Sequence, residues 1–147
     1  MKMAYWYLVE NPTGKTYEQL IQVLCEYADT FYFITRKELQ YDEQVLAQFR
    51  PYVIQTYQSK SWAGTVTQGP PATIYIMKAN ENTCKLLQQL SNSLFDWVSP
   101  RLPEDLTFLK DGRDVFSSTT HEKMGCFELK EDEQYLLQQI EGLKLEN

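Results

Sequence analysis

The sequence predicts an α+β fold: one domain over residues 1–147, in which a mixed β-sheet with a C-terminal antiparallel meander packs against three to five helices. Strand-like and helical apolar patterns alternate through most of the chain, whereas the last third predicts three strands joined by short turns. This meander favours α+β over a doubly wound sheet. A chain of 147 residues with 43% hydrophobic residues buries one ordinary core, and no repeat or linker divides it.

The first part of the chain predicts a strand, a helix and a second strand. Residues 4–9 are aromatic and β-branched, which predicts a central or near-central strand. Thr16 and Gln19 have the spacing of a capping box at the start of an apolar helical stripe. Residues 31–36 are again short, aromatic and β-branched. A strand, a helix and a strand at this spacing predict a right-handed parallel crossover.

The middle of the chain predicts further helices. Residues 42–54 have a helical apolar pattern that Pro51 interrupts. Because proline cannot donate to the helix ladder, we expect two short helices, or one helix kinked at Arg50, with residues 52–54 facing inward. A strong stripe of Leu and Trp predicts a long helix over residues 82–98, capped by the asparagine at its start.

A loop rich in Gly and Pro separates these helices. Residues 59–72 predict a mobile segment, and residues 73–78 predict the strand that follows it. Trp62 lies in this loop. An aromatic ring there either anchors the loop to the core or offers a binding contact, and anchoring is the favoured interpretation.

The last third predicts strands over residues 106–109, 115–119 and 124–129. Asp111-Gly112, between the first two, supplies the positive φ angles that a two-residue type I′ turn needs. Residues 121–123 fall at the tip between the second strand and the third. A final helix from about Glu131 has an acidic first turn, which suits the positive end of the helix dipole.

The net charge of the chain favours some classes of partner over others. The formal net charge is −6, with −1 over residues 1–73 and −5 over residues 74–147. No basic stripe is present to neutralise phosphates, so we expect neither nucleic acid nor an anionic membrane surface as a partner. A protein partner with a basic surface fits this charge through electrostatic steering. A homodimer also fits, because aromatic residues are enriched in such interfaces.

Hydropathy and cysteine usage predict a cytoplasmic location. Residues 1–9 are too short an apolar run for a signal peptide, and no stretch approaches the roughly 18 apolar residues that span a bilayer. The three cysteines, Cys25, Cys84 and Cys126, are odd in number, widely separated and set in apolar patterns. Buried free thiols of this kind are typical of a reducing compartment.

The familiar chemical motifs are missing from the sequence. It contains no Walker loop, no G-x-G-x-x-G, no G-x-S-x-G, no paired C-x-x-C and no H-E-x-x-H. We therefore expect no cofactor. Of the side chains that bind zinc, only His121, Glu122 and Cys126 are close in sequence, which falls short of a convincing ligand set, so we also expect no metal site.

One catalytic arrangement can be drawn on the 117–126 hairpin. His121, the single histidine, would act as the general base. Glu122 or Asp105 would orient it, and Cys126 would be the nucleophile. The plainer interpretation is a polar turn residue beside a cysteine of the core.

Acidic residues also predict a rim at one end of the meander. Glu104 and Asp105 follow Pro103, and carboxylates in that position more often cap a turn than perform acid–base work. The rim is a candidate for contact with a basic partner, and a solvated edge is the plainer interpretation. The candidate binding residues are Trp62, Glu104, Asp105, Asp111, Asp114, His121 and Glu122.

Several short segments spread along the chain form a recognisable set. They are residues 6–11, 62–65 and 102–106, the hairpin around Asp111-Gly112, Phe116 and the pair His121-Glu122. This set resembles a small family from spore-forming bacteria whose members carry the label stage III sporulation protein AH. The resemblance implies a bacterial, cytosolic protein and supplies no catalytic residues. The channel protein that properly bears this label has a membrane anchor, so we expect the label not to describe this chain.

The sequence therefore predicts a non-catalytic, cytosolic bacterial protein with a binding or regulatory role. It would present an acidic and aromatic surface to a protein partner. The alternative is a small enzyme or ligand-binding protein that uses His121 on the hairpin.

Overall fold

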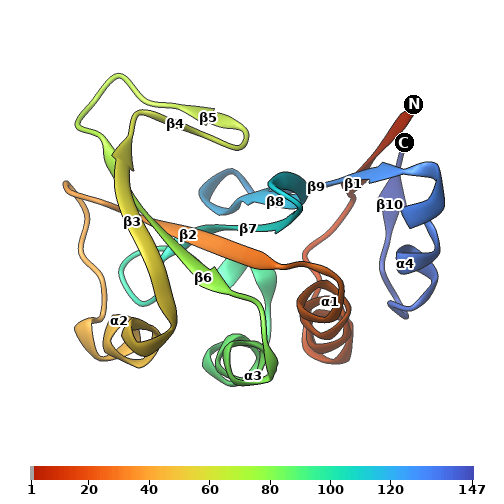
Figure 1. Ribbon diagram of the computed structural model, residues 1–147, viewed down its shortest axis with the longest axis horizontal. Coiled ribbons are helices and arrows are strands. Elements are labelled where there is room, and N and C mark those ends of the chain that lie inside the picture. The colour runs from red at the N-terminus through yellow and green to blue at the C-terminus, as the bar shows by residue number, and fades with distance from the viewer. Residues whose placement is uncertain (1) are drawn as a thin grey trace.

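The computed structural model describes residues 2–147, so only residue 1 of the predicted domain lies outside it. These residues form one α+β domain built on a large sheet (Figure 1). The strands of the sheet are β1 (Met3–Leu8), β2 (Thr30–Arg36), β3 (Val53–Ser59), β6 (Ala72–Lys78), β7 (Glu104–Lys110), β8 (Arg113–Thr119), β9 (Met124–Lys130) and β10 (Leu145–Glu146). The helices are α1 (Gly14–Tyr27), α2 (Glu43–Phe49), α3 (Glu81–Leu90) and α4 (Tyr135–Gln138). Their number agrees with the predicted three to five.

The sheet has the strand order β10-β1-β9-β8-β7-β2-β6-β3. Every pair of neighbours in it is antiparallel over the described residues, so the predicted mixed sheet is wrong. The reason is the place of the meander. Four successive antiparallel pairings separate β1 from β2, so these two strands do run parallel, but β9, β8 and β7 fill the space between them.

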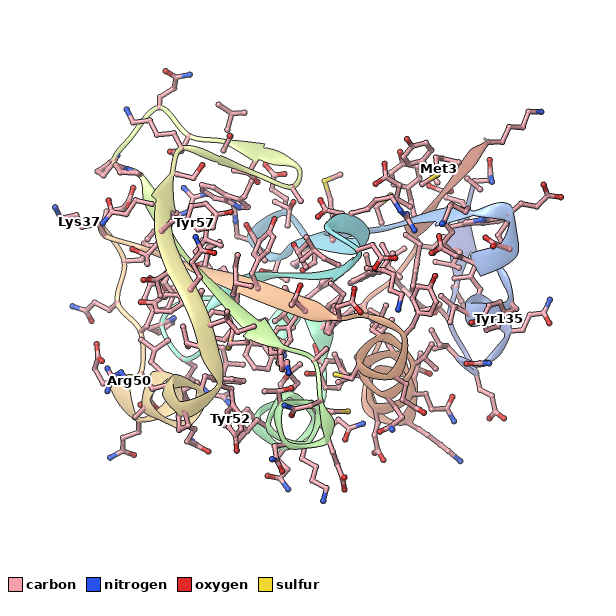
Figure 2. All side chains as sticks on the ribbon, viewed as in Figure 1. Met3, Lys37, Arg50, Tyr52, Tyr57 and Tyr135 are labelled. Atoms are coloured by element: carbon pink, nitrogen blue, oxygen red, sulfur yellow. The ribbon has the colours of Figure 1, made fainter. Side chains whose placement is uncertain are left out.

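The two faces of the sheet are covered differently. Helices α1, α2 and α3 lie together on one face, and a small two-stranded ribbon lies over part of the other face (Figure 1). The ribbon consists of β4 (Ser61–Trp62) and β5 (Thr65–Val66). Side chains fill the layer between the sheet and the helices, where the main core lies (Figure 2). A second, smaller buried cluster joins Trp62 of the ribbon to Tyr32, Ile34, Ala72 and Ile74.

Strand β2 shows why the sequence pattern there is continuously apolar. Phe31 and Phe33 belong to the main core, whereas Tyr32 and Ile34 belong to the cluster at the ribbon. Successive side chains of a strand point to opposite faces, so a strand covered on both faces needs apolar residues at every position. Aromatic contacts stabilise the main core, including Phe31 on Phe108 with ring centroids 5.4 Å apart.

The meander is confirmed. Asp111 and Gly112 have φ angles of 52° and 77°, the positive values that a type I′ turn requires. Strands β7, β8 and β9 pair in sequence around this turn and the short 3₁₀ helix Thr120–Glu122.

The predicted capping box at Thr16 and Gln19 is wrong. Helix α1 already begins at Gly14. The Thr16 hydroxyl donates to the Glu141 carbonyl at 2.8 Å, and the Gln19 side chain accepts from the Glu141 amide at 2.8 Å. Both side chains hold the C-terminal segment against α1 and do not cap the helix.

The prediction for residues 42–54 is correct except at Ile54. Asp42 caps α2 through the Gln44 amide, and the helix ends at Phe49, as the proline requires. A short 3₁₀ helix, Arg50–Tyr52, follows α2, so two short helices are present as predicted, and Tyr52 and Val53 pack against the main core. The chain then enters β3, where Ile54 is 57% exposed and does not face inward. Strand β6 has a free edge beyond β2, and pairing with that edge overrides the weak helical pattern.

The long helix over residues 82–98 is wrong in extent. Helix α3 is capped by Asn80 in a capping box with Thr83, and it ends at Leu90. The Ser91 hydroxyl bonds to the backbone of Ser93, a local bond that competes with the helix. Trp97 is nevertheless fully buried, so the apolar stripe predicts burial correctly.

The final helix is shorter than predicted. A 3₁₀ turn, Glu131–Glu133, precedes the short α4, and the chain then adds β10 to the sheet. Glu133 was expected to be an acidic residue of the first helical turn that interacts with the helix dipole, but it is buried. Its side chain is only 2% exposed and accepts two hydrogen bonds of 2.6 Å from Arg113.

Candidate functional site

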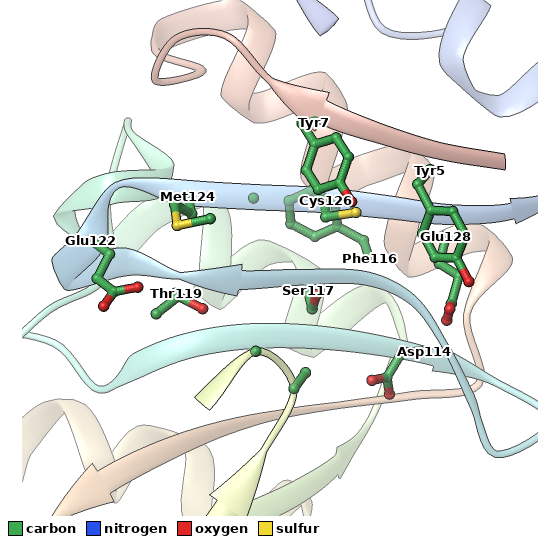
Figure 3. Close-up of a pocket in the computed structure, with 13 residues that line it drawn as sticks. Tyr5, Tyr7, Asp114, Phe116, Ser117, Thr119, Glu122, Met124, Cys126 and Glu128 are labelled. Atoms are coloured by element: carbon green, nitrogen blue, oxygen red, sulfur yellow. The ribbon is translucent and has the colours of Figure 1, made fainter. Parts of the chain in front are cut away.

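The sheet face opposite the helices holds a pocket of about 360 Å³ (Figure 3). Strands β1, β8 and β9 form its floor, and residues 63–64 of the ribbon turn form one wall. Its aromatic and sulfur-containing side chains are Tyr5 and Tyr7 from β1, Phe116 from β8, and Met124 and Cys126 from β9.

Strand register places these side chains on one face. Tyr5 pairs with Glu128, and Tyr7 pairs with Cys126. Directly opposite residues of an antiparallel pair share a face, and their Cβ atoms are close. The alternate residue Trp6 packs against the helix-side core. Tyr5 and Tyr7 are each 44% exposed and Met124 is 52% exposed, so large apolar groups here meet solvent.

The lining of the pocket is acidic. Asp114, Glu122 and Glu128 contribute to it, and none of the described residues that line it is Lys, Arg or His. Burial, and then the charge of Glu128, raises the pKa of Asp114 above its ordinary value of 3.8. Hydrogen bonding to Glu128 raises the pKa of Tyr5 in the same way. The charge of Arg113 lowers the pKa of Asp114 but does not outweigh burial and Glu128, so negative charge dominates this part of the pocket.

A buried aspartate beside the pocket holds the ribbon in place. Asp105 is fully buried and has a φ angle of 61°. One of its carboxylate oxygens accepts from the Trp62 indole at 2.8 Å, and the other accepts from the Thr120 amide at 2.9 Å. Trp62 is only 9% exposed. The interpretation of Trp62 as an anchor of its loop is therefore confirmed.

Gly64 allows the ribbon turn to approach strand β8 of the sheet closely. Its φ is +74°, and a Cβ there would lie 2.9 Å from the Thr119 hydroxyl oxygen. We expect Gly64→Ala to lower the free energy of unfolding by about 2–3 kcal/mol, through backbone strain and overpacking together. Gly112→Ala is the matched control, because Gly112 has a φ of +77° with nothing within 4 Å of the added Cβ. Urea unfolding measures both, and equal losses would contradict the close approach of the ribbon.

Glu104, Asp105 and His121 form a tight polar cluster. Their potential ligand atoms all lie within 4.8 Å of one another. Glu104 is 1% exposed and accepts from the Tyr41 hydroxyl and the Ser99 amide, each at 3.2 Å. Both oxygens of Asp105 also accept hydrogen bonds from the protein. Protein donors occupy both oxygens of Asp105 and the Oε2 of Glu104, whereas the Oε1 of Glu104 lies 3.9 Å from His121, so we assign the cluster a structural role.

The predicted catalytic residues divide between two places: Asp105 and His121 lie in the polar cluster, whereas Glu122 and Cys126 line the pocket. Glu122 or Asp105 was expected to orient His121; Asp105 lies within 4.8 Å of the imidazole, and Glu104 lies 3.9 Å from it. The imidazole is 43% exposed and does not line the pocket that contains Cys126. Burial raises the pKa of Cys126, which opposes formation of a thiolate nucleophile.

The predicted binding residues divide between three places. Asp114 and Glu122 line the pocket. Glu104, Asp105 and His121 form the polar cluster beside it, and Trp62 donates a hydrogen bond to Asp105 of this cluster. Asp111 lies in the hairpin turn, where its amide donates to Asp29 at 2.7 Å.

The sequence analysis did not single out Tyr5, Tyr7 or Glu128 as residues of the site. Interpreting residues 4–9 as a central strand implies that both of its faces are covered, which hides Tyr5 and Tyr7 in the core. The alternation of Tyr5 and Tyr7 with Trp6 was the available signal, but it does not say which face is open.

A second hollow, of about 430 Å³, lies between α1 and α3. Its charges are mixed, and Lys85 is paired with Glu81 of the same helix at 3.3 Å. Its lining lacks the single-sign charge of the pocket on the sheet.

Comparison with protein-family models, curated proteins and solved structures found no match to this chain. Over residues 2–147, none of the helices has the length and hydropathy required to cross a membrane. The fold and the site define a class: a single-domain α+β protein with an acidic, tyrosine-lined pocket on the uncovered part of its sheet.

Proposed function

We propose that this chain is a non-catalytic binding protein whose open sheet face receives a protein partner with a basic surface. The observation that carries the proposal is the pocket itself, where exposed tyrosines surround carboxylates that have no cationic partner in the lining. Tyrosine gives a large contact area at a low cost in conformational entropy, and it is enriched in interfaces. The net charge of −6 adds long-range attraction for a basic partner.

The charge also argues for a different molecule over a second copy of this chain. A two-fold dimer through this face would place the same acidic patch opposite itself. Like charges brought together in this way repel. A basic partner removes that repulsion.

The bacterial cytosol as the location, and the likeness to the sporulation-labelled family, belong to the same proposal. They rest on cysteine usage and on short sequence segments. An enzyme that uses His121 has less support, because the imidazole lies against Glu104 and outside the pocket.

Titration with short peptides tests the proposal. We expect an arginine- and lysine-rich peptide to shift NMR amide signals of β1, β8 and β9, and a glutamate-rich peptide of equal length to leave them unchanged. Tyr5→Ser combined with Tyr7→Ser should weaken basic-peptide binding by about 10-fold. Raising the salt concentration should weaken it as well, because exposed charges are screened.

Tyr135→Ser is the matched control. Tyr135 is 50% exposed on α4 and is not among the residues that line the pocket (Figure 2). Equal binding of the basic and acidic peptides would overturn the proposal, as would an equal effect of the Tyr135 variant. A concentration-dependent dimer that protects β1, β8 and β9 would replace the basic partner with a second copy.

A further inference from the structure

We infer that the pocket on the open sheet face takes the guanidinium group of a single arginine side chain. This inference rests on the proposed function and names the chemistry that the partner must supply.

Two carboxylates define the position of the cation. Asp114 of β8 and Glu128 of β9 both line the pocket and interact through their charges. Charged groups that face Asp114 are Glu128 from β9 and Arg113 from its own strand, and Tyr32 of β2 interacts with it as well. A planar guanidinium can donate to two carboxylates at once, which suits this pair.

Arg113, which precedes Asp114 in the chain, already has hydrogen-bond partners of its own. Arg113 donates to Glu133 twice at 2.6 Å and to the Glu128 carbonyl at 2.9 Å. Its charge therefore neutralises the buried Glu133, and its effect on Asp114 is smaller than the effects of burial and of Glu128. The groups that interact with the side-chain carboxylate of Glu128 are Tyr5, Asp114 and Cys126, and none of the three brings a positive charge.

The tyrosines supply the walls that a guanidinium prefers. Their rings stand on the open side of β1, with Tyr5 beside Glu128 and Tyr7 beside Cys126 (Figure 3). An aromatic face attracts a cation, and a guanidinium also stacks on it. Met124 and Cys126 offer sulfur-containing surface to the methylene groups of the arginine stem.

The size of the pocket limits the occupant. About 360 Å³ lies at the low end of the range for small-molecule sites, roughly 300–1,000 Å³. It suits one long side chain and leaves no room for a large cofactor. The ribbon turn at Gly64 closes one side, so the group must enter from the open face.

Three probes test the inference by NMR titration: the acetylated amides of arginine, lysine and citrulline. Citrulline keeps the shape of arginine and removes its charge. We expect arginine to bind at least 10-fold more tightly than citrulline, and lysine to be weaker than arginine by about 3-fold or more, because an ammonium cannot bridge both carboxylates. Binding should weaken as the pH falls through the pKa of Asp114.

Asp114→Asn and Glu128→Gln should each weaken arginine binding by about 5- to 10-fold. Glu131→Gln is the matched control, because Glu131 is an exposed acid just beyond β9 that does not line the pocket. Asp114→Asn should melt at the temperature of the wild type or slightly above it, because burial and Glu128 penalise the charged form. A loss of binding in this variant would then not reflect a loss of folding.

The outcomes separate this inference from the proposed function. Equal binding of arginine and citrulline would overturn the inference, as would arginine binding that both pocket substitutions leave unchanged. If basic peptides still bind β1, β8 and β9 in those cases, the proposed function stands without a guanidinium site. If no basic peptide binds at all, both fail.

Discussion

Replacing Arg113 with methionine is expected to lower the free energy of unfolding by about 3 kcal/mol. The substitution removes the cation from Glu133, whose side chain is 2% exposed, and leaves a buried carboxylate without its charged partner. Arg113 itself is 27% exposed, so solvent screens part of the interaction and the expected loss lies at the low end of the range for buried pairs. Guanidinium chloride unfolding at pH 7 measures the change.

Lys110→Met is the control for the loss of a charge in the same hairpin. The Lys110 ammonium lies 3.4 Å from the Asp29 carboxylate, and the two side chains are 34% and 48% exposed. We expect this substitution to change stability by less than about 1 kcal/mol. A loss below 1 kcal/mol for Arg113→Met would show that Glu133 does not depend on the arginine.

The same ion pair predicts a dependence on pH. Burial by itself would raise the pKa of Glu133, but hydrogen bonds from Tyr27, the Lys130 amide and Arg113 outweigh it and hold the pKa below the ordinary 4.5. A depressed pKa in the folded state contributes stability above the unfolded value and loses it as the pH falls through the folded value. The difference between wild type and Arg113→Met should therefore be full at pH 7 and should shrink below about pH 4.5.

Replacing Asp105 with alanine is the second large effect, an expected loss of about 3–4 kcal/mol. Asp105 is fully buried, and its carboxylate accepts from the Trp62 indole and the Thr120 amide. Alanine would leave both donors buried without a partner. The ribbon would lose its anchor, so hydrogen exchange should become faster over residues 61–66 while the sheet stays protected.

Asp111→Ala separates the hydrogen bonds from the backbone strain. Asp111 has a φ of 52°, close to the 61° of Asp105, but it is exposed at the hairpin turn. Alanine tolerates a left-handed φ poorly at both positions, so the strain is shared. Equal losses for the two variants would show that the Asp105 carboxylate contributes nothing. Urea unfolding and hydrogen exchange together decide this.

Asp105 of the polar cluster also affects the shape of the pocket. Since Asp105 holds Trp62 down, the ribbon turn at Gly64 stays close to Thr119 and forms a wall of the pocket. Loss of this anchor should weaken ligand binding without any change in the carboxylates of the pocket. Asp105 and Trp62 thus act on binding through position, whereas Asp114 and Glu128 supply the charge that the partner meets.

Local chemistry in the sequence was sufficient for the C-terminal meander. Asp-Gly supplies the two positive φ angles of its turn, and the strand patterns on either side leave one plausible pairing. The burial of Trp97 and the anchoring of Trp62 also follow from residue type, because a large aromatic ring gains most from leaving water. Residue type predicts that these two rings are buried, although the hydrogen bonds that hold them, Trp62 to Asp105 and Trp97 to Tyr17, join residues far apart in sequence.

Tertiary contacts decided the strand order, the uncovered face and the site. The meander inserts between β1 and β2, an arrangement that no local pattern encodes, since antiparallel and parallel neighbours both need apolar strands. The position of the ribbon decides that Tyr32 is covered while Tyr5 and Tyr7 meet solvent. In the sequence, Glu133 resembles an exposed acid at the start of a helix. In the structure it accepts a hydrogen bond from Arg113, twenty residues away. The sequence by itself determined the acidic charge and the aromatic content, whereas only the packing of distant segments placed them together in one pocket.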